Sequence, residues 1–284
     1  MDRKTVLNRM KRNPFFIVGS VACLILMFFV IVVPFFVPHD PLQNSLATKN
    51  IPPQGFSNGF KGHVFGTDQM GRDIFIRLLI GGRYSLAVSF AVATLQILMG
   101  TSLGILSGYF GGIIDMIIMR FCEVVLALPN LILAVAVMSL IGGSIPNLVF
   151  VLFITGWIRN CKITRNDVRV MRAQEFTHAS LALGAKHARV MLTEILPNVT
   201  TQIIIQASQR IGLTILIEAS LSFLGLGIMP PIPSWGNMIS VGRKYMTTAP
   251  WMVFAPGIAL MITCLAFNFL GDGLRDVLDP RRTV

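Results

Sequence analysis

The sequence contains little charge for its length. Of its 284 residues, 13% are charged and 54% are hydrophobic, and the mean hydropathy is +0.70. A soluble domain carries roughly 25% charged residues, so a water-soluble fold of this size would have to expose large apolar patches. The shortage of charge therefore excludes an ordinary soluble domain and indicates a protein that folds in lipid.

Cysteine is also scarce, and its placement forms no pattern. Cys23, Cys122 and Cys264 lie in or beside apolar runs, and Cys161 lies in a basic segment. There is no CxxC pair and no Cys/His cluster, so the sequence predicts neither a disulfide framework nor a metal site. A Gly-x4-Gly-Lys-Ser/Thr phosphate loop is missing as well, so we expect this chain to hold no cofactor and to hydrolyse no ATP alone.

The net charge of +11 is the one feature of the composition that could suggest nucleic acid. The basic residues, however, lie between apolar runs and form no continuous stripe. Charge placed in this way sets the topology of a membrane protein and contacts anionic lipid head groups. We therefore expect membrane lipid, and no nucleic acid, as a partner.

Several apolar runs are candidates for membrane-spanning helices, which need ~20 apolar residues. The first run follows a basic arm and is too long for the apolar region of a signal peptide, so we interpret it as an uncleaved anchor. The third should begin as an amphipathic helix at the membrane surface, and the short fourth needs tilt or cover from its neighbours. The six candidates are Phe15–Val37, Tyr84–Ser107, Ile113–Ile141, Ile145–Ile158, Val199–Gly225 and Trp251–Leu270.

Lys and Arg are distributed unevenly between the segments that connect these runs. They are concentrated in residues 1–14, 159–197 and 271–284 and are fewer in 38–83 and 226–250. Because basic connecting segments stay in the cytoplasm, this bias places both termini there. The predicted division is an N-terminal cytoplasmic arm with the first span at 1–45, an extracytoplasmic segment at 46–82, a transmembrane core at 83–272 with a cytoplasmic loop at about 159–197, and a cytoplasmic tail at 273–284.

The segment between the first two spans is too long to be a simple connector. Its Pro, Gly and Asn residues predict a loop with one short helix near Ile74–Leu79. Trp235, in a later Pro-rich stretch, is expected to anchor the chain at the membrane interface. The charged residues of the loop either brace it, which is the interpretation we favour, or contact a soluble binding protein. They are Asp68, Arg72, Asp73, Arg77 and Arg83.

The loop at 159–197 is the most informative part of the sequence. It has no Gly or Pro between Asn160 and Leu183 and is rich in Ala, Leu, Met and Arg, which predicts an ordered helical hairpin. Gly184 should end or bend a helix, and Pro197 should start the next one. Small residues would let another surface approach closely, whereas the alternative is an amphipathic connector on the membrane. The candidate residues are Glu175, Phe176, His178, Ala179, Ser180, Leu183, Gly184, Ala185 and Pro197.

The fifth span carries a polar ridge. Its members recur every four residues and therefore share one slowly drifting face of a helix. A charge exposed to lipid at this depth costs at least ~2.5–3.5 kcal/mol, so the ridge must face a wet pathway, a partner helix or another charge. The translocation route and a subunit interface stay equally open, and Arg210 and Glu218 could pair with a second subunit. The ridge consists of Gln202, Gln206, Arg210, Thr214 and Glu218.

The stretch 175–185, followed by Ile195–Asn198, resembles the coupling motif of ABC importer permeases. Ala179, Gly184, Leu196 and Pro197 match that motif, whereas His178 stands in place of its glutamate and Ser180 in place of its second alanine. The resemblance implies that this helix docks into a groove of a cytoplasmic ATPase and converts its closure into transmembrane motion.

Four further segments resemble the second permease subunit of the dipeptide, oligopeptide and nickel branch of that family. They are 63–68 with 71–73, 218–227, 230–236 and 271–280. The resemblance implies an all-α type I permease fold with six transmembrane helices in the bacterial cytoplasmic membrane. It also implies a homologous second permease, two ATPase subunits that bind ATP and Mg, and an extracytoplasmic solute-binding protein. Peptides are the expected solute, with nickel or another metal chelate as the alternative.

Two other classes of function were weighed against this one. An intramembrane enzyme needs a nucleophile with a base, or paired carboxylates, at one depth, yet His39, His63, His178 and His187 all lie outside the predicted spans. A self-contained channel or carrier would be supported by an inverted repeat with broken helices, and the sequence shows no such repeat. Neither class is favoured.

Overall fold

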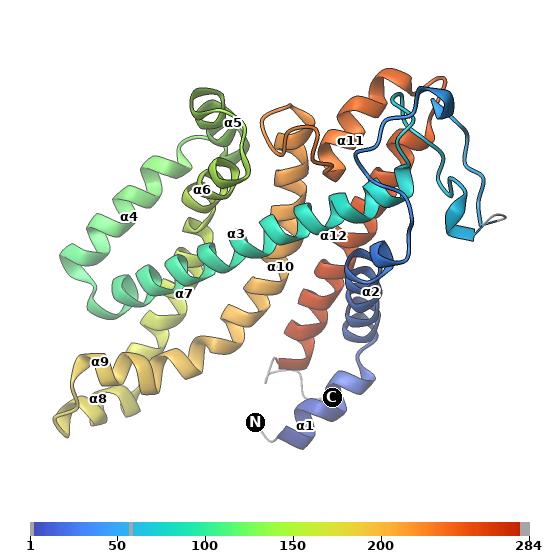
Figure 1. The fold of residues 1–284 in the computed structure, drawn as a ribbon. Coiled ribbons are helices and arrows are strands. Elements are labelled where there is room, and N and C mark those ends of the chain that lie inside the picture. The colour runs from blue at the N-terminus through green and yellow to red at the C-terminus, as the bar shows by residue number, and fades with distance from the viewer. Residues whose placement is uncertain (1–2, 57–58, 279–284) are drawn as a thin grey trace.

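Helices account for the architecture. The computed structural model describes residues 3–56 and 59–278, which contain no β-strand and only one isolated antiparallel bridge, between Thr67 and Asp73. The expected all-α class is thus confirmed. The helices of Figure 1 are α1 (Arg3–Arg12), α2 (Pro14–Ile31), α3 (Ile74–Phe110), α4 (Gly112–Leu126), α5 (Asn130–Ile141), α6 (Ile145–Gly156), α7 (Ile158–Arg172), α8 (Glu175–Ala182), α9 (His187–Val190), α10 (Leu196–Phe223), α11 (Trp235–Gly242) and α12 (Trp251–Leu278).

Asn13 sets the boundary between α1 and α2. Its Oδ1 accepts a hydrogen bond from the backbone N–H of Phe16 at 2.9 Å, and Pro14 lies in the first turn of α2, where a missing N–H has no cost. The last turn of α1 is basic, whereas α2 is apolar and exposes side chains such as Leu24 and Phe28. A helix that is apolar on all sides is stable only in lipid or against other helices.

Three stretches of the described chain are long and apolar enough to cross a membrane: Pro14–Phe35, Ile74–Phe110 and Trp251–Leu278. α4 and α5 together could make a fourth, although they are bent by 80°. α6 has 12 residues and continues through Trp157 into α7, and α10 has 28 residues but carries buried charges. The chain is therefore a multi-pass membrane protein, while six complete crossings stay a prediction.

The expected third span is not one continuous helix. The run 113–141 is divided into α4 and α5, which meet at 80° around residues 127–129. Pro129 is the cause, because it has no N–H for the helical ladder and because the residue before a proline avoids helical backbone. The pair is either a broken span or a re-entrant segment.

The short helix expected at Ile74–Leu79 is instead the beginning of α3, which runs without a break to Phe110. Its 37 residues correspond to about 55 Å of helix. Gly81 and Gly82 do not interrupt this helix; they lie where the chain at Ser234 and Trp235 packs closely against it. A Cβ on Gly82 would lie 2.8 Å from the ring of Trp235. The last part of the predicted extracytoplasmic segment 46–82 is therefore the first part of a membrane helix.

α3 and α7 pack closely along a row of glycines on α3. A Cβ on Gly100, Gly104 or Gly108 would lie 2.6–2.7 Å from a backbone oxygen or a side-chain carbon of α7 and the Trp157 junction before it. These glycines recur every four residues and so form one stripe along the helix. Small residues of this kind let two helices approach closely in a membrane. The stripe fixes α7, and with it α8, against α3.

The described ends of the chain lie at the same end of the bundle as α8. In Figure 1, α1 and the last turns of α12 lie on the side of α8 and α9, whereas the 38–73 segment, α5 and α11 lie on the opposite side. The distribution of Lys and Arg predicts that both termini and the 159–197 loop lie on the same side of the membrane. That prediction requires both ends of the chain and α8 to lie at one end of the bundle. The predicted tail at 273–284 begins as the end of α12, where Asp276 accepts a hydrogen bond from Asn13. Its remaining residues, 279–284, lie outside the described residues.

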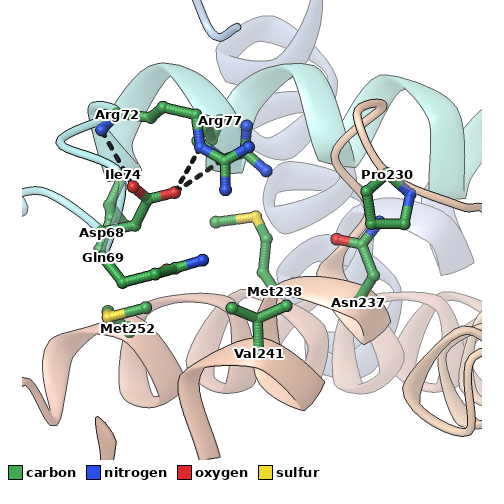
Figure 2. A pocket seen from close by; sticks show the side chains of 10 residues that line it. All are labelled: Asp68, Gln69, Arg72, Ile74, Arg77, Pro230, Asn237, Met238, Val241 and Met252. Atoms are coloured by element: carbon green, nitrogen blue, oxygen red, sulfur yellow. Dashed lines mark hydrogen bonds and ion pairs between the residues drawn. The ribbon is translucent and has the colours of Figure 1, made fainter. Parts of the chain in front are cut away.

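The charged residues near the start of α3 brace the 38–73 segment, as we expected. Asp68 accepts a hydrogen bond from Arg72 Nε at 2.7 Å and lies 3.7 Å from Arg77 Nε. Arg77 donates to the carbonyl of Pro41 at 2.8 Å, and Arg83 donates to that of Val30 at 2.8 Å. Figure 2 shows the Asp68 ion pairs beside Met238 and Val241 of α11 and Met252 of α12.

Trp235 is a core residue rather than the expected interfacial anchor. Its side chain is 2% exposed and packs with Val30, Leu86, Ile215 and Phe267. Its indole N–H donates to the carbonyl of Leu78 at 2.9 Å. The expectation was wrong because a tryptophan is also stable inside a helical core when its indole N–H finds a hydrogen-bond acceptor there.

We predict that Gly104→Ala lowers the free energy of unfolding by about 1–3 kcal/mol, the usual cost of overpacking. The new methyl group would meet the backbone of α7 at 2.7 Å. Thermal unfolding in detergent measures the effect. Gly257→Ala in α12 is the matched control, since nothing lies within 4 Å of its Cβ position. Equal unfolding temperatures for the two variants would contradict the close contact.

Candidate functional site

A polar cavity of about 410 Å³ lies between α7, α10 and α12. Three members of the predicted ridge, Gln202, Gln206 and Arg210, line it from α10. Exposed Arg159 of α7 and Arg275 of α12 contribute two further positive charges. The polar groups that line the cavity are amides and guanidinium groups, with no carboxylate among the lining residues, so the cavity favours an anionic or strongly polar occupant.

Arg210 is held inside the chain. Its side chain is 7% exposed, its Nε donates to Oε1 of Gln96 at 2.5 Å, and its Nη2 donates to the carbonyl of Gly156. Gln96 in turn donates to the carbonyl of Leu152 at 2.6 Å. Arg210, which could have paired with a second subunit, thus finds hydrogen-bond partners in α3 and α6 of its own chain. No carboxylate in the described part of the chain forms an ion pair with Arg210, so its charge reaches the cavity uncompensated.

The other two ridge members face the protein interior. Thr214 donates to the carbonyl of Arg210 at 2.8 Å. Glu218 is fully buried and accepts a hydrogen bond from Ser222 at 2.7 Å, while its Oε2 has no partner among the described residues. Ser222 also accepts from the N–H of Ile228 at 3.0 Å. The ridge therefore divides into a cavity-lining part and a part that fastens the end of α10.

α8 projects from the bundle as an exposed helix. Phe176 is 41% exposed and Leu183 is 89% exposed, although both are apolar. Only Thr177 is buried, and it donates to the carbonyl of Met171 at 2.9 Å. One apolar side chain of α8 and one just after its end are thus left uncovered by the described part of the chain.

Gly184 ends α8, as the sequence predicts. It has φ +84°, and its N–H donates to the carbonyl of Leu181 at 3.0 Å. The N–H of Ala185 donates to the carbonyl of Ser180 at 3.1 Å, which completes a Schellman cap. Ala185 then packs inward, near Val190. Of the predicted coupling residues, Glu175, Phe176, His178, Ala179, Leu183 and Pro197 are exposed, and Ser180 and Ala185 are half-buried.

Pro197 lies in the first turn of α10, but it does not follow a break in the chain. A π-helical segment, Met191–Ile195, joins α9 directly to α10, and the residues at both junctions have helical backbone. The missing N–H of Pro197 therefore removes one hydrogen bond from the helical ladder where the π-helical segment meets α10. The chain from His187 to Phe223 is nevertheless one continuous helical rod.

Two contacts that the sequence did not reveal hold the start of this rod against α3 and α7 against α4. The hydroxyl of Tyr109, at the end of α3, lies 2.7 Å from Nδ1 of His187. Arg165 of α7 donates two hydrogen bonds of 2.5 Å to Asp115 of α4, which raise the pKa of the Arg165 guanidinium above its ordinary value. In the sequence, these contacts are visible only as single polar residues near the ends of apolar runs. Such residues do not reveal which other residue each of them contacts.

Comparison with known proteins assigns the family. Residues 100–284, which include α8 and the whole of α10, match the family described as the binding-protein-dependent transport system inner membrane component. The chain belongs to this family. Residues 3–53 also match the N-terminal transmembrane domain of oligopeptide transport permease C. Members are non-catalytic membrane subunits of ABC importers, in agreement with the resemblance of the 175–185 stretch.

Individual relatives cover between 77% and 98% of this permease. It is 39% identical to the dipeptide transport system permease protein DppC of Alkalihalophilus pseudofirmus, over 96% of this chain and 88% of the relative. It is 36% identical to the oligopeptide transport system permease protein OppC of Bacillus subtilis, over 98% and 89%. It is 41% identical to the glutathione transport system permease protein GsiD of Pectobacterium atrosepticum, over 77% and 73%.

We predict that Arg210 and Gln96 are energetically coupled. The test is a double-mutant cycle with Arg210→Leu and Gln96→Leu. The double variant should lose less free energy of unfolding than the two single variants lose together, by about 0.5–3 kcal/mol. Each single variant leaves a buried polar group unpaired, and that is the costly state. Unfolding in detergent provides the measurement. The exposed Arg120–Glu123 pair, at 3.1 Å, is the control and should show coupling near zero; additive losses at Arg210 and Gln96 would disprove the contact.

Proposed function

We propose that the chain is the second permease subunit of an ABC importer for di- and oligopeptides, and that α8 docks onto a cytoplasmic ATPase. The observation that carries the proposal is the exposed, capped helix α8 at the end of a continuous rod that reaches Arg210. The coupling surface consists of Glu175, Phe176, His178, Ala179, Ser180, Leu183 and Gly184.

The transmission of force follows from the rigidity of the connection. α8 is joined to α9 by a short turn, and α9 continues through Met191–Ile195 into α10 without a flexible residue. A displacement of α8 therefore turns or tilts α10 rather than being absorbed by a loop. Because Gln202, Gln206 and Arg210 lie on α10, the same displacement changes the shape of the polar cavity. Alternating access would result from this rigid-body motion.

The partners are those that an ABC importer needs. We infer a homologous permease as the second half of the translocation path, two ATPase subunits that supply ATP and Mg binding, and an extracytoplasmic solute-binding protein that sets most of the specificity. The proposed location is the bacterial cytoplasmic membrane, with both termini and α8 in the cytoplasm. α6 with α7, the bent α4–α5 pair, and α10 would complete six crossings with cover from neighbouring helices.

Peptides are the solute class that the relatives and the cavity favour. The names of the three relatives described above refer to dipeptides, oligopeptides and glutathione. The cavity contains Arg159, Arg210 and Arg275. Guanidinium groups bind carboxylates well, and every free peptide ends in one. The nickel alternative has no comparable support, since no carboxylate, His or Cys lines this cavity.

We predict that Leu183→Glu abolishes docking of the ATPase. A carboxylate buried without a partner at this interface should weaken the association about ten-fold or more, which corresponds to about 1.4 kcal/mol. Co-purification of the ATPase subunits with the permease pair, together with peptide-stimulated ATP hydrolysis, measures the effect.

Leu46→Glu is the matched control for that variant. Leu46 is 80% exposed, like Leu183, but lies in the 38–73 segment at the opposite end of the bundle. It should leave ATPase binding unchanged. If Leu183→Glu retained the ATPase and the hydrolysis rate of the unmodified complex, α8 would not be the coupling element.

We also predict that the cavity prefers peptides with a free carboxyl terminus. Arg159→Gln removes one positive charge, worth about 1 kcal/mol of attraction to a carboxylate in a wet site. The uptake ratio of a peptide to its C-terminal amide should therefore fall about five-fold, while the receptor's own preference cancels in the comparison. Lys244→Gln, an exposed residue outside the cavity, is the control. An unchanged ratio in Arg159→Gln would exclude carboxylate recognition at this cavity.

A further inference from the structure

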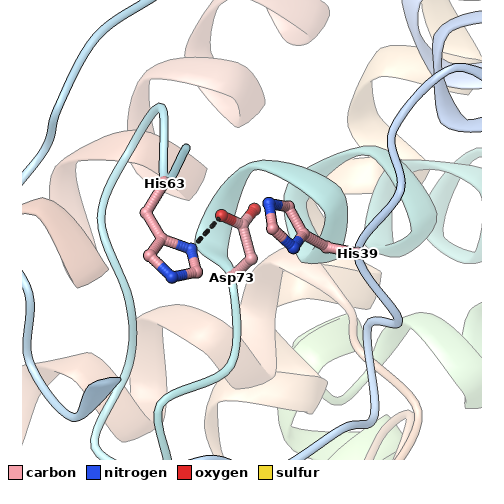
Figure 3. A group of neighbouring side chains, drawn as sticks. All are labelled: His39, His63 and Asp73. Carbon is pink, nitrogen blue, oxygen red and sulfur yellow. Dashed lines mark hydrogen bonds and ion pairs between the residues drawn. The ribbon is translucent and has the colours of Figure 1, made fainter. Parts of the chain in front are cut away.

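Three side chains from separate parts of the 38–73 segment meet at the start of α3. His39 follows the turn after α2, His63 comes from the loop, and Asp73 is the N-cap of α3. One ligand atom of each lies within 4.8 Å of the others. Figure 3 shows the two imidazole rings on either side of the Asp73 carboxylate. Their centroids are 5.1 Å apart, so the nitrogens of both rings can reach one point.

The hydrogen bonding of the cluster is incomplete. Nε2 of His39 is buried and has no hydrogen-bond partner among the described residues. Buried side-chain nitrogens nearly always have a partner, so this atom points to a ligand. Solvent does not reach it, although the histidine as a whole is half-buried.

Asp73 divides its two oxygens between two tasks. Oδ1 accepts the N–H of Ile76 at 3.0 Å and so caps α3. Oδ2 lies 2.8 Å from Nδ1 of His63. Two ligands at about 2.0–2.1 Å from a tetrahedral zinc ion lie about 3.4 Å apart. An opening of this contact by roughly half an ångström would therefore let an ion enter while the helix cap persists.

We propose that His39, His63 and Asp73 bind a divalent transition-metal ion of zinc chemistry, which ties the 38–73 segment to the start of α3. Two imidazoles and one carboxylate suit zinc and related ions, whereas calcium and magnesium take oxygen ligands. Three protein ligands leave a fourth position for water or for a donor of a partner protein. The three ligands are far apart in the chain and meet only in the folded structure. Binding of the ion would therefore stabilise the folded state of the segment.

The proposed site departs from the sequence-based expectation that the chain has no metal site. That expectation rested on ligand spacing along the sequence, and His39, His63 and Asp73 match no spacing pattern. Only the folding of the loop over α3 brings them together. The cluster lies apart from α8 and from the cavity at Arg210, so it stands independently of the peptide-transport proposal.

The test uses the full chain, purified in detergent, treated with a chelator and then titrated with zinc chloride by calorimetry. We expect about one zinc ion per chain and a higher unfolding temperature in its presence. His39→Ala and His63→Ala should each weaken binding about ten-fold or more. Asp73→Asn keeps an N-cap side chain, because asparagine caps helices as well as aspartate, but removes the anionic ligand and should also weaken binding.

His178→Ala removes an exposed histidine outside the cluster and should leave zinc binding unchanged. His63→Cys supplies another zinc ligand and should restore the binding that His63→Ala loses. If His63 had only a structural role, the cysteine variant would not be expected to regain zinc binding. Titration of the unmodified chain with cobalt(II), followed by its visible absorption, shows tetrahedral coordination without any variant. Absence of zinc and cobalt binding by the unmodified chain would overturn the proposal. So would stoichiometric binding that survives both His39→Ala and His63→Ala.

Discussion

The close contact of α3 with α7 is the interaction on which the rest of the structure depends. Lipid provides no hydrophobic driving force between helices, so dispersion across a tight interface and internal hydrogen bonds must hold them together. The stripe at Gly100, Gly104 and Gly108 brings the two helices to backbone distance. The same helix α3 carries Gln96 toward Arg210 and Tyr109 toward His187. A separation of α3 from α7 would therefore disturb both the cavity and the position of α8.

Polar groups are placed where the chain itself can satisfy them or where a partner is expected. Arg210 donates hydrogen bonds to one amide and one carbonyl, and its charge faces a polar cavity instead of lipid. At the opposite end, Asp68 and Asp73 organise the start of α3 through Arg72, Arg77 and His63. The apolar exposure of Phe176 and Leu183 is the reverse case. These side chains lie on α8 and on the turn after it, and nothing in the described part of the chain covers them.

The rod from His187 to Phe223 explains how distant parts of the molecule can act together. Helices resist bending much more than loops do, and this one contains no break between the turn after α8 and the buried Glu218. Its π-helical stretch, Met191–Ile195, adds one local widening near the connection to α8, a feature that is frequent at functional sites. The residues of α10 that line the cavity and the segment that follows the turn after α8 therefore belong to one continuous helix.

The sequence by itself determined the membrane class, the helical nature of 159–197, the end of α8 at Gly184 and the shared face of Gln202, Gln206 and Arg210. All of these follow from composition, local backbone preference or helical periodicity, which act over a few residues. Tertiary structure alone decided that Gln96 satisfies Arg210, that Trp235 is buried and that His39, His63 and Asp73 meet. The bend at Pro129 and the unbroken start of α3 at Ile74 needed it too. Long-range contacts depend on which helix faces pack together, and the spacing of residues along the chain does not predict which faces these are.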